Sequence, residues 1–135
     1  MVSRGIRNNN PGNIRKGEKW QGLSAIQNDS SFCVFKTPAY GIRALAILLK
    51  NYYEKYGLDT VTKIIKRYAP HTENDTDAYI ESVSRALGVL PKRRINPTEP
   101  EVMLKLIKAI ILHENGSQPY NEEILIKGLE MAGIK

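Results

Sequence analysis

This sequence contains very little cysteine and histidine, and it has no long apolar run. Cys33 is the single cysteine, so no disulfide can form within the chain. With only two histidines, His71 and His113, and no cysteine cluster, we expect neither a metal site nor a cofactor. The N-terminus has no apolar segment of the signal-peptide kind, and no apolar run is long enough to span a bilayer. We therefore expect a protein without a membrane span that is made in a reducing compartment.

Negative charge is also scarce relative to positive charge. The 135 residues carry a net charge of +6, with a pI of about 9.5, which favours an anionic partner. Lys and Arg are spread along the chain except for the run Lys92-Arg93-Arg94. A basic surface of this kind usually serves solubility, so we expect no specific nucleic-acid binding. The length fits one domain over residues 1–135.

The first 37 residues are rich in Gly, Asn, Pro and Ser, and residues 7–13 are dense in turn formers. Two short runs, 19–21 and 32–36, have the character of strands and predict a small hairpin. We therefore expect residues 1–37 to form an irregular polar lobe with a β-hairpin.

Apolar residues recur at helical spacing after Pro38, which predicts a helical body over residues 38–135. The fold class is therefore all-α, apart from the N-terminal lobe. The expected helices lie over about 39–56, from a cap at Asp59 to Pro70, from a cap at Asn74 or Asp75 to Gly88, from Thr98 to about Glu114, and after Pro119. Thr98 and Glu101 form a T-x-x-E capping-box pattern at the start of the fourth of these helices.

A carboxylate continues the apolar face of that fourth helix. Met103, Ile107 and Ile110 share one face, and the next position in the series is Glu114. Burial of a charge is costly, and desolvation favours the protonated form of a carboxylate. A protonated carboxyl group at neutral pH is what a general acid requires. A frayed helix end before Gly116 would instead leave Glu114 exposed, as helix ends often are.

The segment 109–116, which ends in His113-Glu114-Asn115-Gly116, resembles the catalytic helix of lytic transglycosylases and goose-type lysozymes. Residues 9–14 with Trp20 and Gly22 resemble the Asn-rich loop and Trp-x-Gly segment of lysozyme-like enzymes, and residues 35–43 resemble their Phe-x-x-Tyr segment. Residues 74–83 are similar to the Asn-x-x-x-Tyr-Val pattern of transglycosylases. Taken together, the chain resembles small phage or prophage virion proteins related to lytic enzymes. In the familiar enzymes the catalytic helix precedes these loops, so the order here resembles a circular permutation.

The resemblance implies a lysozyme-like fold and a glycosidase that cleaves the β-1,4 link between MurNAc and GlcNAc of peptidoglycan. It implies Glu114 as the acid and then the base, with Glu73 as the second catalytic candidate and a helix-capping role as the alternative for Glu73. Glu18 and Asp29 are weaker candidates for a second acid. The expected substrate-binding residues supply flat rings and amides: Asn10, Asn13, Trp20, Tyr40, Tyr79 and Tyr120. For the tyrosines the alternative is core packing, and for the asparagines it is turn formation.

The resemblance also implies a protein made in a host cytoplasm without a signal peptide that acts on the cell wall as a monomer or as part of a virion. Three other functions stay open. The first is a non-catalytic virion structural or wall-binding protein, the second is a DNA-binding protein suggested by the Lys92-Arg93-Arg94 run, and the third is a peptide-bond hydrolase.

Overall fold

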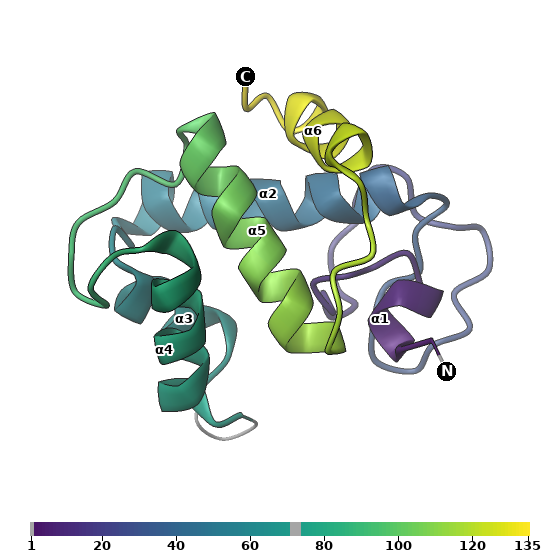
Figure 1. The fold of residues 1–135 in the computed structure, drawn as a ribbon. Helices are drawn as coiled ribbons and strands as arrows, with labels where there is room; N and C mark the ends of the chain where they lie inside the picture. Colours follow the sequence, from purple (N-terminus) through teal and green to yellow (C-terminus); the bar gives the residue numbers. More distant parts are fainter. Residues whose placement is uncertain (1, 71–73) are drawn as a thin grey trace.

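The computed structural model describes residues 2–70 and 74–135, and these residues are mainly helical. The helices of this part of the chain are α1 (Arg4–Arg7), α2 (Pro38–Tyr56), α3 (Val61–Tyr68), α4 (Thr76–Leu87), α5 (Pro100–Asn115) and α6 (Glu122–Met131). The longest helix, α2, lies across the middle of the molecule, and α5 crosses it (Figure 1). α6 packs along α2, while α3 and α4 pack together beside α5. None of these helices combines the length and the apolarity needed to cross a membrane.

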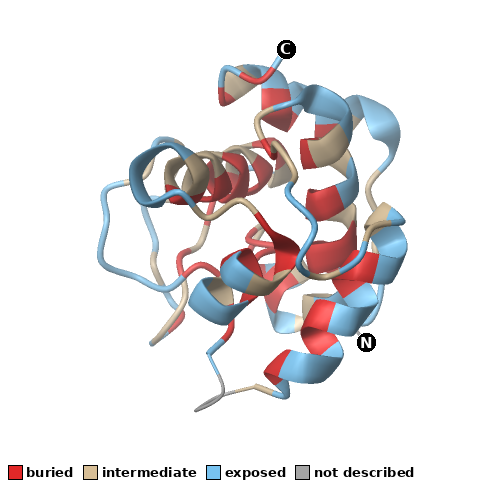
Figure 2. Cartoon of the chain, turned by 90° about the vertical axis from the view of Figure 1, so that its left-hand side faces the viewer, coloured by how far each residue is buried: buried red, intermediate tan, exposed pale blue. Residues whose placement is uncertain are grey.

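The core lies where the helices face one another, and their outer faces are exposed (Figure 2). The predicted stripe on α5 is fully buried at Met103, Ile107 and Ile110. The approach of α6 to α2 is close because Gly128 has no side chain: a Cβ atom there would lie 2.4 Å from Ile42 Cγ2. Residues of the N-terminal lobe, among them Phe35, join the same buried cluster. The lobe is therefore packed onto the helical body.

The helices begin and end close to the predicted positions, with two differences in how they start. The cap of α3 is Thr60, whose hydroxyl accepts a hydrogen bond from Lys63 N, and not Asp59. The capping box at α5 is wrong: the helix starts at Pro100 with Glu99 as its N-cap residue, and no side chain caps it. Proline at the first helical position moves the cap to the residue before it, and Thr98 bonds instead to Asn96 Oδ1.

The predicted hairpin is wrong in its pairing. Within residues 2–37 the backbone forms only isolated antiparallel bridges, Arg15 with Phe32 and Leu23 with Phe35. The short helix α1 also precedes them, capped by the Ser3 hydroxyl. Backbone hydrogen bonds around these bridges hold the lobe together with side chains, since asparagine amides also bond to its carbonyl groups.

Asp29 is the most heavily bonded acid of the N-terminal lobe. Arg4 donates to both of its carboxylate oxygens, with N···O distances of 2.7 and 2.6 Å, and Asn8 Nδ2 donates at 2.9 Å. The amides of Ser31 and Phe32 each donate to Oδ1 at 2.9 Å. The Arg4 guanidinium and these amides hold the pKa of the Asp29 carboxyl well below its usual range. Asp29 therefore links α1, through Arg4, to the backbone of residues 31–32.

Asp29 should make the stability of the lobe depend on pH in the acid range. Its folded pKa lies below the unfolded value of about 3.9, so its stabilisation is complete above that value and is lost as the pH falls below it. The variant Asp29→Asn should be less stable than wild type at pH 7, and the difference should narrow steadily below about pH 4. Urea midpoints across this range measure the difference, with Glu130→Gln, an exposed acid on α6, as the control. A difference between wild type and Asp29→Asn that does not change with pH would contradict this assignment.

Candidate functional site

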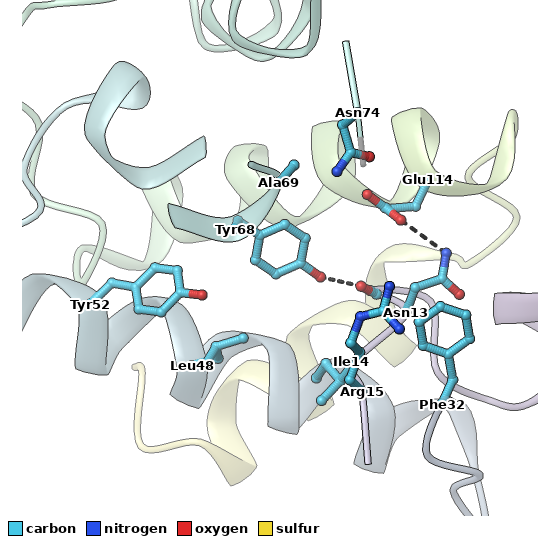
Figure 3. A pocket seen from close by; sticks show the side chains of 11 residues that line it. Asn13, Ile14, Arg15, Phe32, Leu48, Tyr52, Tyr68, Ala69, Asn74 and Glu114 are labelled. Atoms are coloured by element: carbon cyan, nitrogen blue, oxygen red, sulfur yellow. Dashed lines mark hydrogen bonds between the residues drawn. The ribbon is translucent and has the colours of Figure 1, made fainter. Parts of the chain in front are cut away.

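A pocket of about 370 Å³ opens between the N-terminal lobe and helices α2, α3 and α5 (Figure 3). Its walls combine polar side chains, three rings and a few aliphatic groups. The lining residues are Gly12, Asn13, Ile14, Arg15, Phe32, Leu48, Tyr52, Tyr68, Ala69, Asn74 and Glu114. A pocket of this size and mixed lining has the character of a small-ligand or sugar site.

Glu114 lies in the last turn of α5, before the left-handed Gly116 that ends the helix. Its side chain is half-buried, and the carboxyl group points into the pocket between Asn74 and Asn13 (Figure 3). Asn13 Nδ2 donates to Glu114 Oε1 at 2.9 Å, and the Tyr79 hydroxyl donates to Oε2 at 2.9 Å. Each carboxylate oxygen thus has its own donor, and the carboxyl group is held in one orientation.

Asn13 reaches Glu114 because the backbone turns sharply there. Its φ angle is 52°, in the left-handed region that asparagine tolerates better than most residues. The carbonyl of the preceding residue, Gly12, accepts a hydrogen bond from the Tyr68 hydroxyl. Burial raises the pKa of Tyr68 well above its usual value, and the nearby Glu114 raises it further, so this hydroxyl keeps its proton and remains a donor. A side chain from α3 therefore holds the loop that presents Asn13.

Tyr79 is buried and does not offer an exposed ring on which a sugar could stack. Its side chain is fully buried on α4, and its ring stacks on His113 with centroids 3.7 Å apart. Burial, together with Tyr68 and Glu114, raises the pKa of Tyr79, so its hydroxyl stays protonated and can donate to the carboxylate. Tyr79 is a partner of Glu114 and not part of the pocket wall.

Asn115, the residue after Glu114, fastens the N-terminal segment to the end of α5. Its Nδ2 donates to Pro11 O at 2.8 Å and to Ile111 O at 2.9 Å, and its Oδ1 accepts from the Ser3 hydroxyl at 2.7 Å. The sequence analysis did not predict this role of Asn115. The one available signal was its position next to the candidate acid, Glu114. Asn115 keeps the turn at Pro11 next to Glu114.

Besides Tyr79, four further expected binding residues do not line the pocket. Asn10 is fully buried, and its amide is used within the lobe by Ile14 N, Ile14 O and Cys33 O. Tyr40 packs against the backbone at Gly22, where a Cβ atom would lie 2.1 Å from the ring. Trp20 is half-buried against the core. Tyr120 is also half-buried, and burial raises its pKa to about 12.

Glu114 is the one carboxylate among the described residues that line the pocket. Glu73, the second candidate, lies outside the described residues, and its neighbour Asn74 lines the pocket. Asp29 is engaged by Arg4, and Glu18 is exposed and away from the lining. The part of the chain that the structure describes contains no cluster of three His, Cys, Asp or Glu side chains that could hold a metal ion.

Sequence reasoning also missed the pocket wall opposite Glu114. Tyr52 and Tyr68 form it together with Leu48, all from α2 and α3. Arg15 lies at the rim, with its guanidinium carbon 5.1 Å from the centroid of the Phe32 ring. The tyrosines continue the apolar faces of their helices, so their sequence pattern is that of core residues.

The comparison with known proteins places the chain in a phage protein family. No protein-family model matches the sequence. The chain is 42% identical over 133 residues to a protein named Protein P5 from Pseudoalteromonas phage PM2, and the match covers 96% of this chain and 81% of that protein. At this identity and coverage, the chain belongs to the same family as Protein P5 of phage PM2.

Gly5 should be required for the contact between α1 and the site. A Cβ atom on Gly5 would lie 2.5 Å from Asn115 Oδ1, 2.8 Å from Asn13 Oδ1 and 2.9 Å from the carbonyl oxygen of Asn10. Gly5→Ala should therefore lower the free energy of unfolding by about 1–3 kcal/mol, since α1 must shift away from α5. At an exposed helical position without close neighbours, Gly→Ala raises the free energy of unfolding. The sign of the change therefore shows whether Gly5 is closely packed. Denaturant unfolding measures it, with Arg7→Ala, an exposed position of α1, as the control; a stabilised Gly5→Ala would contradict the packing.

Proposed function

We propose that the protein is a peptidoglycan glycosidase of the lytic transglycosylase or lysozyme type, with Glu114 as general acid and then general base. The observation that carries the proposal is the carboxyl group of Glu114, held by Asn13 and Tyr79 at the wall of a pocket. The bond to be cleaved is the β-1,4 link between MurNAc and GlcNAc. The net charge of +6 suits an anionic wall polymer. A lysozyme-like, permuted arrangement over residues 1–135 is part of the same proposal.

Cleavage of a glycosidic bond starts with transfer of a proton to the leaving oxygen. Glu114 supplies this proton in the proposed reaction, and the bond between the anomeric carbon and the bridging oxygen breaks. The Tyr79 hydroxyl can donate to the ionised carboxylate and accept from the protonated carboxyl, so it can bond to both states. Asn13 donates to the other oxygen, so the carboxyl group is held in one orientation.

The second half of the reaction needs a base and a nucleophile. The ionised Glu114 can accept a proton either from water or from the 6-hydroxyl group of the sugar, which gives a hydrolysed or a 1,6-anhydro product. Since Glu114 is the one carboxylate in the described lining, the proposal favours the route in which the substrate's own acetamido and hydroxyl groups assist. A hydrolase with two carboxylates about 5 to 9.5 Å apart would require a second acid, such as Glu73.

Replacement of Glu114 by glutamine tests the proposal directly. Glu114→Gln keeps the size of the side chain but cannot transfer a proton, so release of soluble muropeptides from purified sacculi should fall by at least about 100-fold. Mass spectrometry of the wild-type products reports both the bond that is cut and the presence of an anhydro end. Glu18→Gln, an exposed acid away from the pocket, is the matched control and should retain full activity.

Two outcomes would favour other functions. If wild type and Glu114→Gln release no muropeptide but bind sacculi equally, the chain is a wall-binding or virion structural protein, in which Glu114 serves only to join the lobe to α5. If peptide bonds are cut in place of glycosidic bonds, the reaction class is wrong. Retention of full activity by Glu114→Gln would exclude the assigned acid.

Tyr79 should act as a positioning residue because it is buried and its hydroxyl donates to the Glu114 carboxyl group. Tyr79→Phe removes one hydroxyl group and leaves the ring stack on His113 in place. We expect kcat to fall about tenfold, the value of one hydrogen bond to a charged group, while KM stays unchanged. Steady-state kinetics on a soluble glycan fragment separates the two constants; Tyr53→Phe on α2 is a control, and a change in KM alone would contradict the assignment.

A further inference from the structure

Arg15 is the one cation among the described residues that line the pocket, as Glu114 is the one carboxylate among them. Figure 3 shows Arg15 with Asn13 and Phe32 on the side of the pocket that the N-terminal lobe forms. The residue is exposed, so a ligand that enters from solvent can reach its charge. A pocket with one acid and one cation suits a sugar that carries an anionic substituent.

The backbone at Arg15 is fixed by the strand-like pairing of the lobe. Arg15 and Phe32 lie opposite each other in an isolated antiparallel bridge. The amides of Lys16 and Cys33, which follow these two residues, donate to carbonyl groups across the bridge at 2.9 and 3.0 Å. Directly opposed residues of an antiparallel pair present their side chains on the same face. The guanidinium carbon of Arg15 accordingly lies 5.1 Å from the centroid of the Phe32 ring.

The ring of Phe32 is supported in turn by a second arginine. The guanidinium carbon of Arg4 lies 4.6 Å from the same centroid, and Arg4 donates to both carboxylate oxygens of Asp29. Contact with an aromatic ring engages the charge of a guanidinium group, while its five N–H donors lie along its edge. Five donors are enough for Arg15 to keep an interaction within the chain and to bind a carboxylate of a ligand as well. The lobe therefore presents Arg15 at the pocket rim from a fixed position.

Arg15 is also close to the proposed acid along the chain. It follows two residues after Asn13, whose amide donates to Glu114, and two residues of chain span at most about 7 Å. The pocket volume of about 370 Å³ is near the lower end of the range for small-ligand sites. A sugar whose bridging oxygen lies at Glu114 therefore has its ring substituents near the rim, where Arg15 is placed.

We propose that Arg15 makes the pocket selective for MurNAc by binding a carboxylate on the substituent at the 3-position of the sugar. The inference rests on the proposed glycosidase function. MurNAc differs from GlcNAc by a lactyl ether at this position. The lactyl carboxyl group is free in peptide-free glycan, and in the intact wall it is joined to a peptide with carboxylates of its own. A guanidinium group binds a carboxylate through two parallel hydrogen bonds, and the neutral GlcNAc offers no such partner.

Steady-state kinetics on soluble glycan tests the proposal with the full chain. Arg15→Gln removes the charge and should lower kcat/KM by about 10- to 100-fold, the value of a hydrogen bond to a charged group. The loss should lie mainly in KM, because the contact is the same in the ground state and in the transition state. A loss on peptide-free strands assigns the lactyl carboxylate, and a loss on peptide-bearing strands alone assigns the carboxylates of the peptide; either supports the proposal.

Titration calorimetry supplies a measurement that does not depend on cleavage. Glycan strands are compared with chitin oligosaccharides, which contain GlcNAc alone and carry no carboxylate. Wild type should bind peptide-bearing strands at least about tenfold more tightly than chitin oligosaccharides, and Arg15→Gln should lose this difference. The affinity for chitin oligosaccharides should be the same in both proteins.

Matched variants separate Arg15 from general charge. Lys16→Gln removes the same charge from the next residue, which is exposed and outside the pocket lining, and it should behave as wild type does. Arg15→Lys keeps the charge but not the paired donors, so it should recover part of the affinity. Urea midpoints establish that each variant is folded. If Arg15→Gln does not fold, Arg15→Lys and the wild-type comparison decide, and equal wild-type affinity for peptide-bearing strands and chitin oligosaccharides overturns the proposal.

The outcomes distinguish this proposal from the proposed function. Equal loss in Lys16→Gln, undiminished kcat/KM of folded Arg15→Gln, or an equal loss of affinity for chitin oligosaccharides would each overturn the role of Arg15 and leave Glu114 as the acid. If wild type cuts no glycan but strand binding is lost in Arg15→Gln, the glycosidase is wrong and carboxylate recognition by Arg15 stands. Absence of both cleavage and binding would overturn both.

Discussion

The hydrogen bonds between the last turn of α5 and the turn at residues 11–13 join two regions of the chain that are about a hundred residues apart. Glu114 accepts from Asn13, and Asn115 donates to Pro11 O. Closure of so long a loop costs entropy, which packing of the lobe on the helical body must offset. Because both partners on α5 are neighbours at a helix end, a small shift of the lobe would break both contacts and open the pocket.

Two tyrosine hydroxyl groups, from α3 and α4, hold the residues on both sides of these contacts. The hydroxyl of Tyr68 fixes Gly12, and that of Tyr79 fixes Glu114. Their surroundings raise the pKa of both tyrosines, so both hydroxyl groups keep their protons and can donate. α3 and α4 therefore each supply one hydroxyl group to the site, and Tyr68 of α3 also lines the pocket. The core that positions these helices also orients the carboxyl group.

The net charge is unevenly distributed along the chain. The pocket and its single described carboxylate lie beside the N-terminal lobe, while most of the net charge is carried by α3 and the loop before α5. α5 extends between these two regions, with a buried face that includes Ile107 and Ile110. A helix anchored in the core along its length is stiff, so the loop before α5 is held at a fixed distance from Glu114 in the last turn.

The sequence by itself determined the helices after residue 37, because apolar periodicity, glycine C-caps and prolines act locally, but it did not reveal α1. It also singled out Glu114, because the spacing of the residues alone shows a carboxylate continuing the apolar face of Met103, Ile107 and Ile110. Only the tertiary structure decided the partners. Asn10 and Asn13 are alike in a turn-rich string, yet one is buried in the lobe and the other reaches Glu114. Tyr79 and Tyr40 are both aromatic residues on helices, and only long-range packing brings one of them to the acid. Such contacts depend on how distant segments are closed together, and no local pattern encodes that closure.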